Sequence, residues 1–389
     1  MKMKMKRKLP IAWLQLKKEK SRMFVAIAGI AFADVLMFLQ MGFRSALFNG
    51  AVQIHNVLDG EIFLVSRRYK SLISLDRFSE RRLYQALGYT GVKSVSPIYL
   101  SPVQWKNPEN KQIWNLYAIG FNPNDKTLNL PGVQANLEQL KRPDTVMFDA
   151  GARREFGDIP FVFKEQGVFS TEVENRRVDV IGLFKLGTSF GINGHLVTSD
   201  VNFLRLFGER RQKGLIDMGV IKLNNPVDTN RVLGNLRSGL PDDVLVISKQ
   251  EFLDKEKGFW NSSTPVGYVF DLGAVIGFIV GAVIVYQILY SDVSDHLPEY
   301  ATLKAIGFRD RYLLSVVFTE AMILAAMGFI PGLGISLGFY YITRQATLLP
   351  MVMTVGRAIF VLTLTAFMCG ISAAIAIRKL QSADPADVF

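Results

Sequence analysis

Four long apolar stretches constrain this chain more than any other feature of its sequence. They cover Met23–Phe43, Val266–Tyr290, Tyr312–Ile342 and Ala358–Ile377. A helix needs roughly 20 apolar residues to cross the hydrocarbon core of a bilayer, and each stretch is long enough. Because lipid offers no hydrogen-bond partner to bare backbone, the stretches predict four membrane-spanning helices. We therefore expect one span, a large insert, and then three spans close together.

Positive charge is concentrated before the first span. The net charge is +11, and residues 1–22 hold nine Lys or Arg against the single acid Glu19. Such a basic flank marks the cytoplasmic side of a span and does not indicate a nucleic-acid-binding groove. The sequence thus predicts a multi-pass inner-membrane protein with both ends in the cytoplasm. Residues 44–265 and 343–357 are expected outside, and residues 1–22, 291–311 and 378–389 are expected inside.

The segment before the first span allows two interpretations. Leu9–Lys20 mixes apolar side chains with lysines, which indicates either an interfacial helix on the inner leaflet or a basic flank that only sets orientation. The apolar run that follows is longer than a signal-peptide core and has no A-x-A site after it. We therefore predict an uncleaved anchor.

The insert has the pattern of an α+β domain. Its expected strands are rich in β-branched and apolar residues: Glu61–Ser66, Ile113–Phe121, Val178–Leu186, Ile216–Leu223 and Val244–Ser248. Its expected helices are Leu75–Leu87, Val201–Phe207, Asp228–Leu236 and Lys249–Gly258. Ser199-Asp200 and Ser248 are suited to capping two of these helices. The predicted fold is a membrane protein with one plus three transmembrane helices and this large α+β domain between the first two.

Motifs for catalysis and nucleotide binding are missing from the sequence. There is no G-x-x-x-x-G-K-[ST] phosphate-binding loop and no G-x-S-x-G elbow. His55, His195 and His296 are scattered, and Cys369 is the single cysteine. We expect no catalytic residue, no metal and no cofactor. A membrane-anchored periplasmic enzyme is kept as an alternative, because a site assembled from distant residues leaves no local motif.

Three acids fall inside the predicted spans. Asp34 lies near the middle of the first span, Asp271 near the outer end of the second, and Glu320 about two turns into the third. Because a charge in the bilayer is costly, such residues face protein or water. An ion relay is one interpretation, and we favour the other, in which Asp34 and Glu320 bond to neighbouring helices.

Small residues four positions apart recur on the second and third spans. They are Gly273, Gly277 and Gly281 on the second, and Gly328, Gly332, Gly334 and Gly338 on the third. This spacing lets helix backbones approach closely. It predicts helix–helix contacts, either within the chain or across a dimer, and Pro331 predicts a bend in the third span.

The predicted inner loop holds the most specific local pattern. Pro298 suits a first helical turn and Gly307 the position after the last turn, so a helix of about nine residues is expected. Leu303 and Ile306 would form an apolar stripe that enters a groove on a cytoplasmic partner, or the helix lies flat on the membrane. The residues assigned to this docking helix are Pro298, Glu299, Tyr300, Leu303, Lys304, Ile306 and Gly307.

The same loop carries a resemblance to a known family. Glu299–Phe308, E-Y-A-T-L-K-A-I-G-F, resembles the signature between the second and third spans of FtsX-like permeases, the membrane subunits of macrolide-exporter-type (type VII) ABC systems. The one-plus-three layout and the ending Ala383–Asp387 are similar as well. The leader Ala12–Arg22, A-W-L-Q-L-K-K-E-K-S-R, resembles the DevC-type permeases of cyanobacterial heterocyst glycolipid exporters.

The resemblance implies a transport subunit and not an enzyme. Such permeases dimerise within membrane lipids and pair with an ABC ATPase, which docks on the coupling helix, here about Pro298–Gly307. Hydrolysis on that separate chain would move the spans and, by mechanotransmission, the periplasmic domain. A periplasmic adaptor and an outer-membrane channel would complete export of a lipid-like substrate. The alternative is an FtsX-like transmitter that regulates a cell-wall hydrolase without moving cargo.

Overall fold

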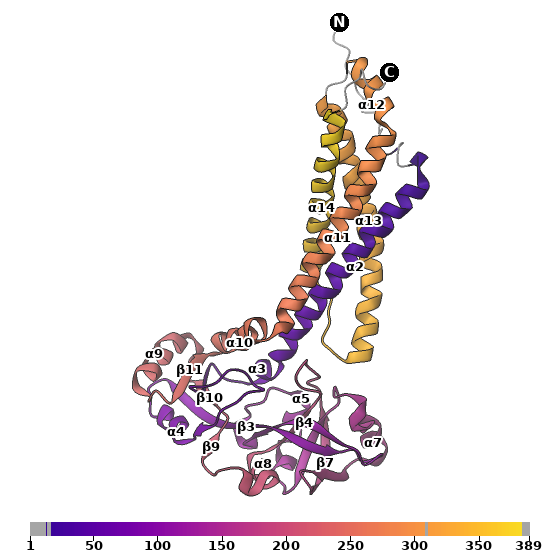
Figure 1. Ribbon diagram of the computed structural model, residues 1–389. Helices are drawn as coiled ribbons and strands as arrows, with labels where there is room; N and C mark the ends of the chain where they lie inside the picture. The colour runs from indigo at the N-terminus through magenta and orange to yellow at the C-terminus, as the bar shows by residue number, and fades with distance from the viewer. Residues whose placement is uncertain (1–12, 14–16, 308–309, 383–389) are drawn as a thin grey trace. The chain divides into compact units, whose positions relative to one another are not determined.

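The chain folds into two compact units, one made of long helices and one formed by the insert. The computed structural model describes residue 13, residues 17–307 and residues 310–382 (Figure 1). The helical unit takes residues up to 44, 268–342 and 351 onward, and the insert takes 45–267 with 343–350. Most of the predicted leader helix Leu9–Lys20 and the tail Ala383–Asp387 lie outside the described residues.

Four helices of the first unit are long and apolar enough to cross a membrane, which confirms the predicted fold class. They are α2 (Lys20–Ala51), α11 (Pro265–Asp295), α13 (Asp310–Thr347) and α14 (Val355–Ser382). Each helix extends beyond its apolar stretch. The hydropathy pattern shows where apolar side chains give way to polar ones. The helix itself continues past that point, because many polar residues also favour helical backbone. Pro331 lies inside α13 without ending it.

The four helices share one apolar core. Ala26 and Ile30 of α2 pack there with Val285 and Leu289 of α11 and with Ala321 of α13. Small side chains in this core allow close helix contact.

Hydrogen bonds fasten the opposite end of the helices. The Tyr340 hydroxyl of α13 donates to the Phe38 carbonyl of α2 at 2.6 Å. Arg357 of α14 donates to the Tyr340 oxygen at 2.9 Å. Three helices are therefore joined at one buried tyrosine.

The insert is an α+β domain around a nine-stranded sheet. Its strands are β1 (Ile62–Ser66), β3 (Val92–Lys106), β4 (Ile113–Phe121), β5 (Thr145–Asp149), β6 (Phe169–Val173), β7 (Arg176–Phe184), β8 (His195–Ser199), β10 (Met218–Leu223) and β11 (Val244–Ser248). The strand order is β11-β1-β10-β3-β4-β8-β5-β7-β6, and β6 also pairs with the far end of β3. A second, two-stranded sheet joins β2 (Phe78–Ser79) to β9 (Leu215–Ile216).

Helices connect the strands of the insert. They are α3 (Gln53–Val57), α4 (Arg81–Leu87), α5 (Pro131–Gln134), α6 (Leu137–Leu140), α7 (Ile159–Gln166), α8 (Asp200–Phe207), α9 (Thr229–Gly239) and α10 (Lys249–Gly258). The succession β1-α4-β3 and β10-α9-β11, with the order β11-β1-β10-β3, is a β-α-β-β-α-β unit. The remaining strands are inserted between β3 and β10.

Both faces of the main sheet are covered. Along β1, Ile62 and Leu64 point into one core, and Phe63 and Val65 point into the other. Alternate side chains of a strand lie on opposite faces, so a strand that is apolar at every position must be buried on both. This explains the continuous apolar run Ile62–Val65.

The longest strand, β3, is absent from the sequence prediction because it contains Pro97 and Pro102. Proline cannot donate to a β-ladder and normally argues against a central strand. In the structure, Pro97 pairs only with β10 and Pro102 only with β4. Each proline is thus paired with a neighbouring strand on only one of its two sides. Because no strand is paired on the other side, a missing N–H group there removes no hydrogen bond of the sheet.

The predicted helix Leu75–Leu87 is wrong in its first half. Phe78 pairs with Ile216 in the small sheet, and the helix begins only at Arg81. The Glu80 N–H donates to the Gly214 carbonyl at 2.9 Å. Burial of Phe78 in the core outweighs the local helical preference, because tertiary packing commonly overrides propensity.

Ser248 caps α10 as predicted. Its hydroxyl accepts from the Glu251 N–H at 3.2 Å, and the Glu251 carboxylate accepts from the Ser248 N–H at 2.8 Å. We expect Ser248→Ala to destabilise α10 by about 1 kcal/mol, because this capping box satisfies two otherwise unpaired donors. Hydrogen exchange of the α10 amides measures the effect. The control Ser238→Ala, at an exposed serine of α9, should shift exchange of its helix by less than about 0.5 kcal/mol.

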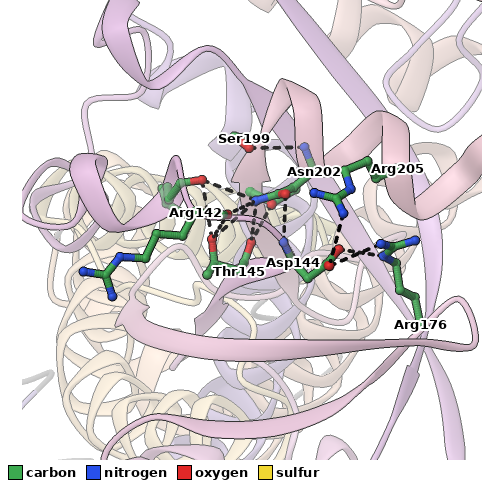
Figure 2. Close-up of polar contacts among 9 residues, drawn as sticks. Arg142, Asp144, Thr145, Arg176, Ser199, Asn202 and Arg205 are labelled. Atoms are coloured by element: carbon green, nitrogen blue, oxygen red, sulfur yellow. Dashed lines mark hydrogen bonds and ion pairs between the residues drawn. The ribbon is translucent and has the colours of Figure 1, made fainter.

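A network of polar contacts fixes the turn before β5 (Figure 2). The buried Asn202 amide donates to the Arg142 carbonyl at 2.8 Å and accepts from the Asp144 N–H at 2.9 Å. The Arg176 guanidinium donates to the Asp144 carboxylate at 2.6 Å, and Arg205 lies 3.5 Å from it. The network ties α8 and β7 to the start of β5.

This network makes part of the stability pH-dependent. The hydrogen bond from Arg176, followed by the charges of Arg176 and Arg205, holds the pKa of Asp144 below its ordinary value. A depressed carboxyl pKa stabilises the fold above the unfolded pKa, about 3.9, and this contribution is lost as the pH falls through the lower folded pKa. We expect Arg176→Gln to lower stability at pH 6 and the difference to close below about pH 4.

Asp144→Asn is the matched control for this pH effect. Asp144 has a φ of 58°, which asparagine tolerates. The variant therefore keeps the backbone and removes the titrating group. Unfolding curves of this variant with and without Arg176→Gln should differ by the same amount at pH 6 and at pH 3. A gap that still closed with pH would contradict the assignment to Asp144.

Candidate functional site: the loop helix and the buried acids

A short helix, α12 (Leu297–Ala305), lies between α11 and α13 (Figure 1). It has nine residues, and Gly307 follows with a φ of 105°, a backbone conformation that favours glycine. Ile306, the residue after the end of α12, is 72% exposed. The side chains of Leu303 and Lys304 lie outside the described part of the chain. The stripe formed by Leu303 and Ile306 therefore stays a prediction.

Tyr300 does not belong to the exposed face of α12. Only 1% of its surface is accessible, and it packs in the core shared by the long helices. Its aromatic ring buries a large apolar area where α12 folds back onto its neighbours, so Tyr300 contacts the bundle and not solvent. Pro298, Glu299 and Thr302 remain exposed on α12. Tyr300 is therefore the anchor that holds α12 against the bundle.

Ion pairs connect the α11–α12 turn to the start of α2. Arg22 of α2 pairs with Asp295 at the end of α11 and with Glu19, whose carboxylate lies 2.8 Å away. Lys18 lies 3.8 Å from Glu299 of α12. An exposed pair such as Lys18–Glu299 contributes little by itself, but the group defines one position of the turn relative to α2. These partners could not be predicted from the sequence, because Arg22 and Asp295 are 273 positions apart along the chain.

Buried polar residues lie directly beside this turn. Glu320 of α13 and Asp292 of α11 are 1% and 7% exposed, and both line the same small cavity. His296 lies 3.5 Å from Asp292. The predicted intramembrane acid Glu320 thus lies beside a polar residue of a neighbouring helix. The interaction energy of polar groups that are buried together depends strongly on their distances and angles. A shift of α11 against α13 would therefore disturb this cluster.

The other two intramembrane acids have partners on neighbouring helices. Asp34 is fully buried, and the Thr365 hydroxyl of α14 donates to it at 2.5 Å. Asp271 pairs with Arg44 of α2 at 2.7 Å. Asp34 and Asp271 therefore bond to other helices of the bundle, and Glu320 lies beside Asp292 of α11.

The glycines of the second and third spans lie against α2. A Cβ atom at Gly273 would meet Gln40, and one at Gly277 would meet Leu36. A Cβ atom at Gly281 would meet Ala33 of α2 and Met368 of α14. On α13, Gly328 faces Ile30, and Gly332 faces Asp34 and Ala31. These contacts place α2 between α11 and α13.

Gly334 and Gly338 differ from the other glycines of α13. A Cβ atom at either position would meet none of the described atoms within 4 Å. Gly334 is two positions after Gly332, which is more than half a turn of an α-helix. The two glycines therefore lie on different faces of α13. Gly328 and Gly332 thus make close contacts within the chain. Gly334 and Gly338 make no such contact with the described residues.

The histidines of the insert occupy buried structural positions. His195 is 1% exposed, and its Nδ1 lies 3.1 Å from Asp149, which also accepts backbone N–H groups of Gly151, Leu186 and Gly187. Burial, followed by the charge of Lys249, lowers the pKa of His55 to about 3. Among the described residues, no group of three or more His, Cys, Asp or Glu could hold a metal ion. Neither histidine is accessible to a substrate.

Comparison with known proteins assigns the C-terminal part of the chain. Residues 272–385 match the family described as FtsX-like permease C-terminal. The match begins in α11 and includes α12, α13 and α14. This region therefore resembles the C-terminal part of FtsX-like permeases. No curated protein sequence matches the chain.

Two solved structures resemble the insert at low identity. One is the periplasmic region of MacB from Actinobacillus actinomycetemcomitans, with 14% identity, a TM-score of 0.35, and coverage of 54% of this chain and 97% of that one. The other is the extracellular domain of the noncanonic ABC-type transporter YknZ from Gram-positive bacteria, with 13% identity, a TM-score of 0.34, and coverage of 48% and 98%.

Proposed function

We propose that this chain is the permease subunit of an ATP-driven type VII ABC exporter. The match of residues 272–385 to the FtsX-like permease C-terminal family carries the proposal. The exposed Ile306 beside α12 supports it, because a helix with a projecting apolar residue suits a groove on a partner. In this proposal α12 is the coupling helix, and a separate ABC ATPase docks on it from the cytoplasm.

The ionic contacts suggest how motion would pass from the ATPase to the insert. A push on α12 acts on Tyr300 in the helix core and on Asp295, which is paired with Arg22 of α2. Because α2 leads directly into the insert, a shift of α2 changes the insert at its first residues. The proposal therefore describes mechanical transmission through packed helices, with the insert in the periplasm and both chain ends in the cytoplasm.

The finer features of the exporter belong to the same proposal. They are a homodimer, a periplasmic adaptor, an outer-membrane channel and a lipid-like cargo. Similarity to DevC-type permeases rests on Ala12–Arg22 and on the inner-loop residues Glu299–Phe308. Four spans in each chain leave little room for a wide aqueous channel, which favours a cargo that enters from the bilayer or the periplasm.

Purification of the full chain from its native membrane tests the proposal. We expect a nucleotide-binding protein to co-elute in fixed ratio and to hydrolyse ATP. Elution without any such protein, both in mild detergent and after chemical cross-linking, would exclude the permease assignment. A strain that lacks this chain distinguishes the exporter from the alternative, a regulator of a cell-wall hydrolase. That alternative predicts a wall or division defect without loss of an exported compound.

A further inference from the structure

The strand β4 has an unpaired edge at its beginning. Residues Ile113–Leu116 pair with β3 on one side. The neighbour on the other side is β8, which pairs with β4 only from Tyr117 onward, where Tyr117 lies opposite His195. No other strand in the described part of the chain pairs with the beginning of β4. One side of Ile113–Leu116 is therefore a free strand edge within the insert.

Backbone groups of this edge point away from the sheet. The Asn107 N–H donates to the Gln112 carbonyl at 2.8 Å, which marks one hydrogen-bonded pair of the β3–β4 hairpin. Bonded and non-bonded pairs alternate along an antiparallel ladder, so Trp114 bonds to β3. The N–H and C=O groups of Ile113 and Asn115 therefore point to the free side, about 6.8 Å apart along the strand.

The side chains at this edge do not protect it. Ile113 and Trp114 are 58% and 39% exposed, and Asn115 is exposed and uncharged. Proteins commonly guard a free edge with charged residues, with proline or with a covering segment, because such an edge pairs readily with another chain. None of the residues Ile113–Leu116 is charged or proline. The edge is therefore open to strand pairing.

A cavity of about 330 Å³ lies beside the same edge, and Asn115 and Leu116 belong to its lining. Leu116 and Ile192 form a buried apolar floor, since they are 2% and 9% exposed. Ile73, at 48% exposure, is an accessible apolar wall. None of the lining residues carries a charge, so a charged group would lose its hydration without an opposite charge in return. The cavity therefore suits an apolar side chain.

The kind of partner follows from the edge and the cavity together. A lipid or a small solute could fill the cavity but could not satisfy the repeated N–H and C=O groups of the edge. An extended polypeptide has donors and acceptors with the same repeat, and its alternate side chains point to opposite faces. In strand addition, main-chain hydrogen bonds give the affinity and pockets for side chains give the specificity.

We propose that the free edge of β4 binds an extended, uncharged segment of another polypeptide by strand addition. Ile113 and Asn115 exchange backbone hydrogen bonds with this segment, and one of its apolar side chains packs on Leu116 and Ile192 in the cavity. The inference concerns a surface of the insert alone. It goes beyond the proposed export function and does not depend on it.

Binding of a synthetic peptide to the full chain in nanodiscs tests the proposal. The probe is the capped, uncharged peptide Thr-Val-Leu-Val-Thr with a neutral fluorophore. Fluorescence anisotropy measures its binding, and empty nanodiscs report how much peptide partitions into lipid. We expect the same peptide, methylated at every backbone nitrogen, to bind about tenfold more weakly, because it keeps the side chains and loses the donors.

Asn115→Pro tests the edge from the side of the protein. The Asn115 N–H makes no bond to β3, so proline removes a donor of the free edge without removing a bond of the hairpin. We expect about tenfold weaker peptide binding, and normal binding by the matched control Asn115→Thr, which keeps the N–H group.

Ile73→Glu tests the cavity. A charge at this wall should weaken peptide binding about tenfold, because an apolar anchor would take water from the carboxylate. The matched control is Val227→Glu, the same new side chain at a position of the insert that is 87% exposed and outside the cavity lining. This control should bind the peptide normally.

Equal binding of the methylated and unmethylated peptides would overturn the proposal. That comparison uses the original chain, so it decides the question even where Asn115→Pro fails to fold. Absence of binding at about 1 mM peptide, or unchanged binding in both Asn115→Pro and Ile73→Glu, would overturn it as well. Asn115→Cys tests a second copy of this chain as the occupant, since Cys369 is buried. Disulfide-linked pairs of that variant in the absence of peptide would assign the edge to a contact between copies and overturn the proposal.

Discussion

Ile306→Asp is expected to break the association between this chain and its ATPase. The Ile306 side chain is 72% exposed beside α12, so the substitution removes an apolar anchor without disturbing a core. In a docked complex the new carboxylate would lose its hydration inside an apolar groove. An anchor of this kind contributes about 2 kcal/mol or more, which corresponds to roughly 30-fold weaker binding. Co-elution of the ATPase and its turnover with the reconstituted chain measure the effect.

The control for this prediction is Val227→Asp, an equally drastic change at an exposed site of the insert. It should leave ATPase binding and turnover unchanged. The sequence pattern predicts the same loss for Leu303→Asp. Docking and turnover that survived both α12 substitutions would refute the assignment of α12 as the coupling helix, even if an ATPase co-purifies with the chain.

Gly332→Leu is expected to give the largest loss of stability among the helix contacts. A Cβ atom at this position would lie 2.9 Å from the Asp34 Cβ and 3.2 Å from backbone atoms of Ala31. The backbone of α2 cannot move aside locally, so α13 must separate from α2 and disturb the bond between Asp34 and Thr365. Overpacking of this kind costs about 3 kcal/mol. The thermal unfolding midpoint of the chain in detergent measures it.

Gly334→Leu is the matched control, because it adds the same side chain to the same helix two residues away. None of the described atoms lies within 4 Å of a Cβ atom at Gly334. We expect this variant to unfold within a few degrees of the original chain. Equal losses for the two variants would show that glycine itself, and not the contact with α2, is what the helix requires.

The membrane helices could be predicted from the sequence because the signal is local. Twenty consecutive apolar residues predict a span whatever surrounds them, so α2, α11, α13 and α14 were expected at their observed places. In the insert, β4 and β11 have the predicted bounds, since their β-branched and aromatic residues favour strands. The strand β3 could not be predicted, because its two prolines are tolerated only by the way its neighbours pair.

The candidate site was predictable in part. Pro298 and Gly307 indicated the ends of a short helix, and α12 ends two residues before Gly307. The burial of Tyr300 was not predictable, because it depends on the side chains that α11 and α13 bring to one place. The contact of Arg22 with Asp295 and the position of Glu320 beside Asp292 involve helices that are distant in sequence. Such pairs leave no periodic pattern.

The sequence by itself determined the number of apolar helices, the insertion of an α+β domain after the first of them, and the short helix between the second and third. Each depends on composition or spacing within a single segment, where the free energy of burial or capping is decided locally. Only the tertiary structure decided which glycines face α2 and which acids are bonded across helices. These features depend on distances between segments, and such distances exist only after the chain has packed.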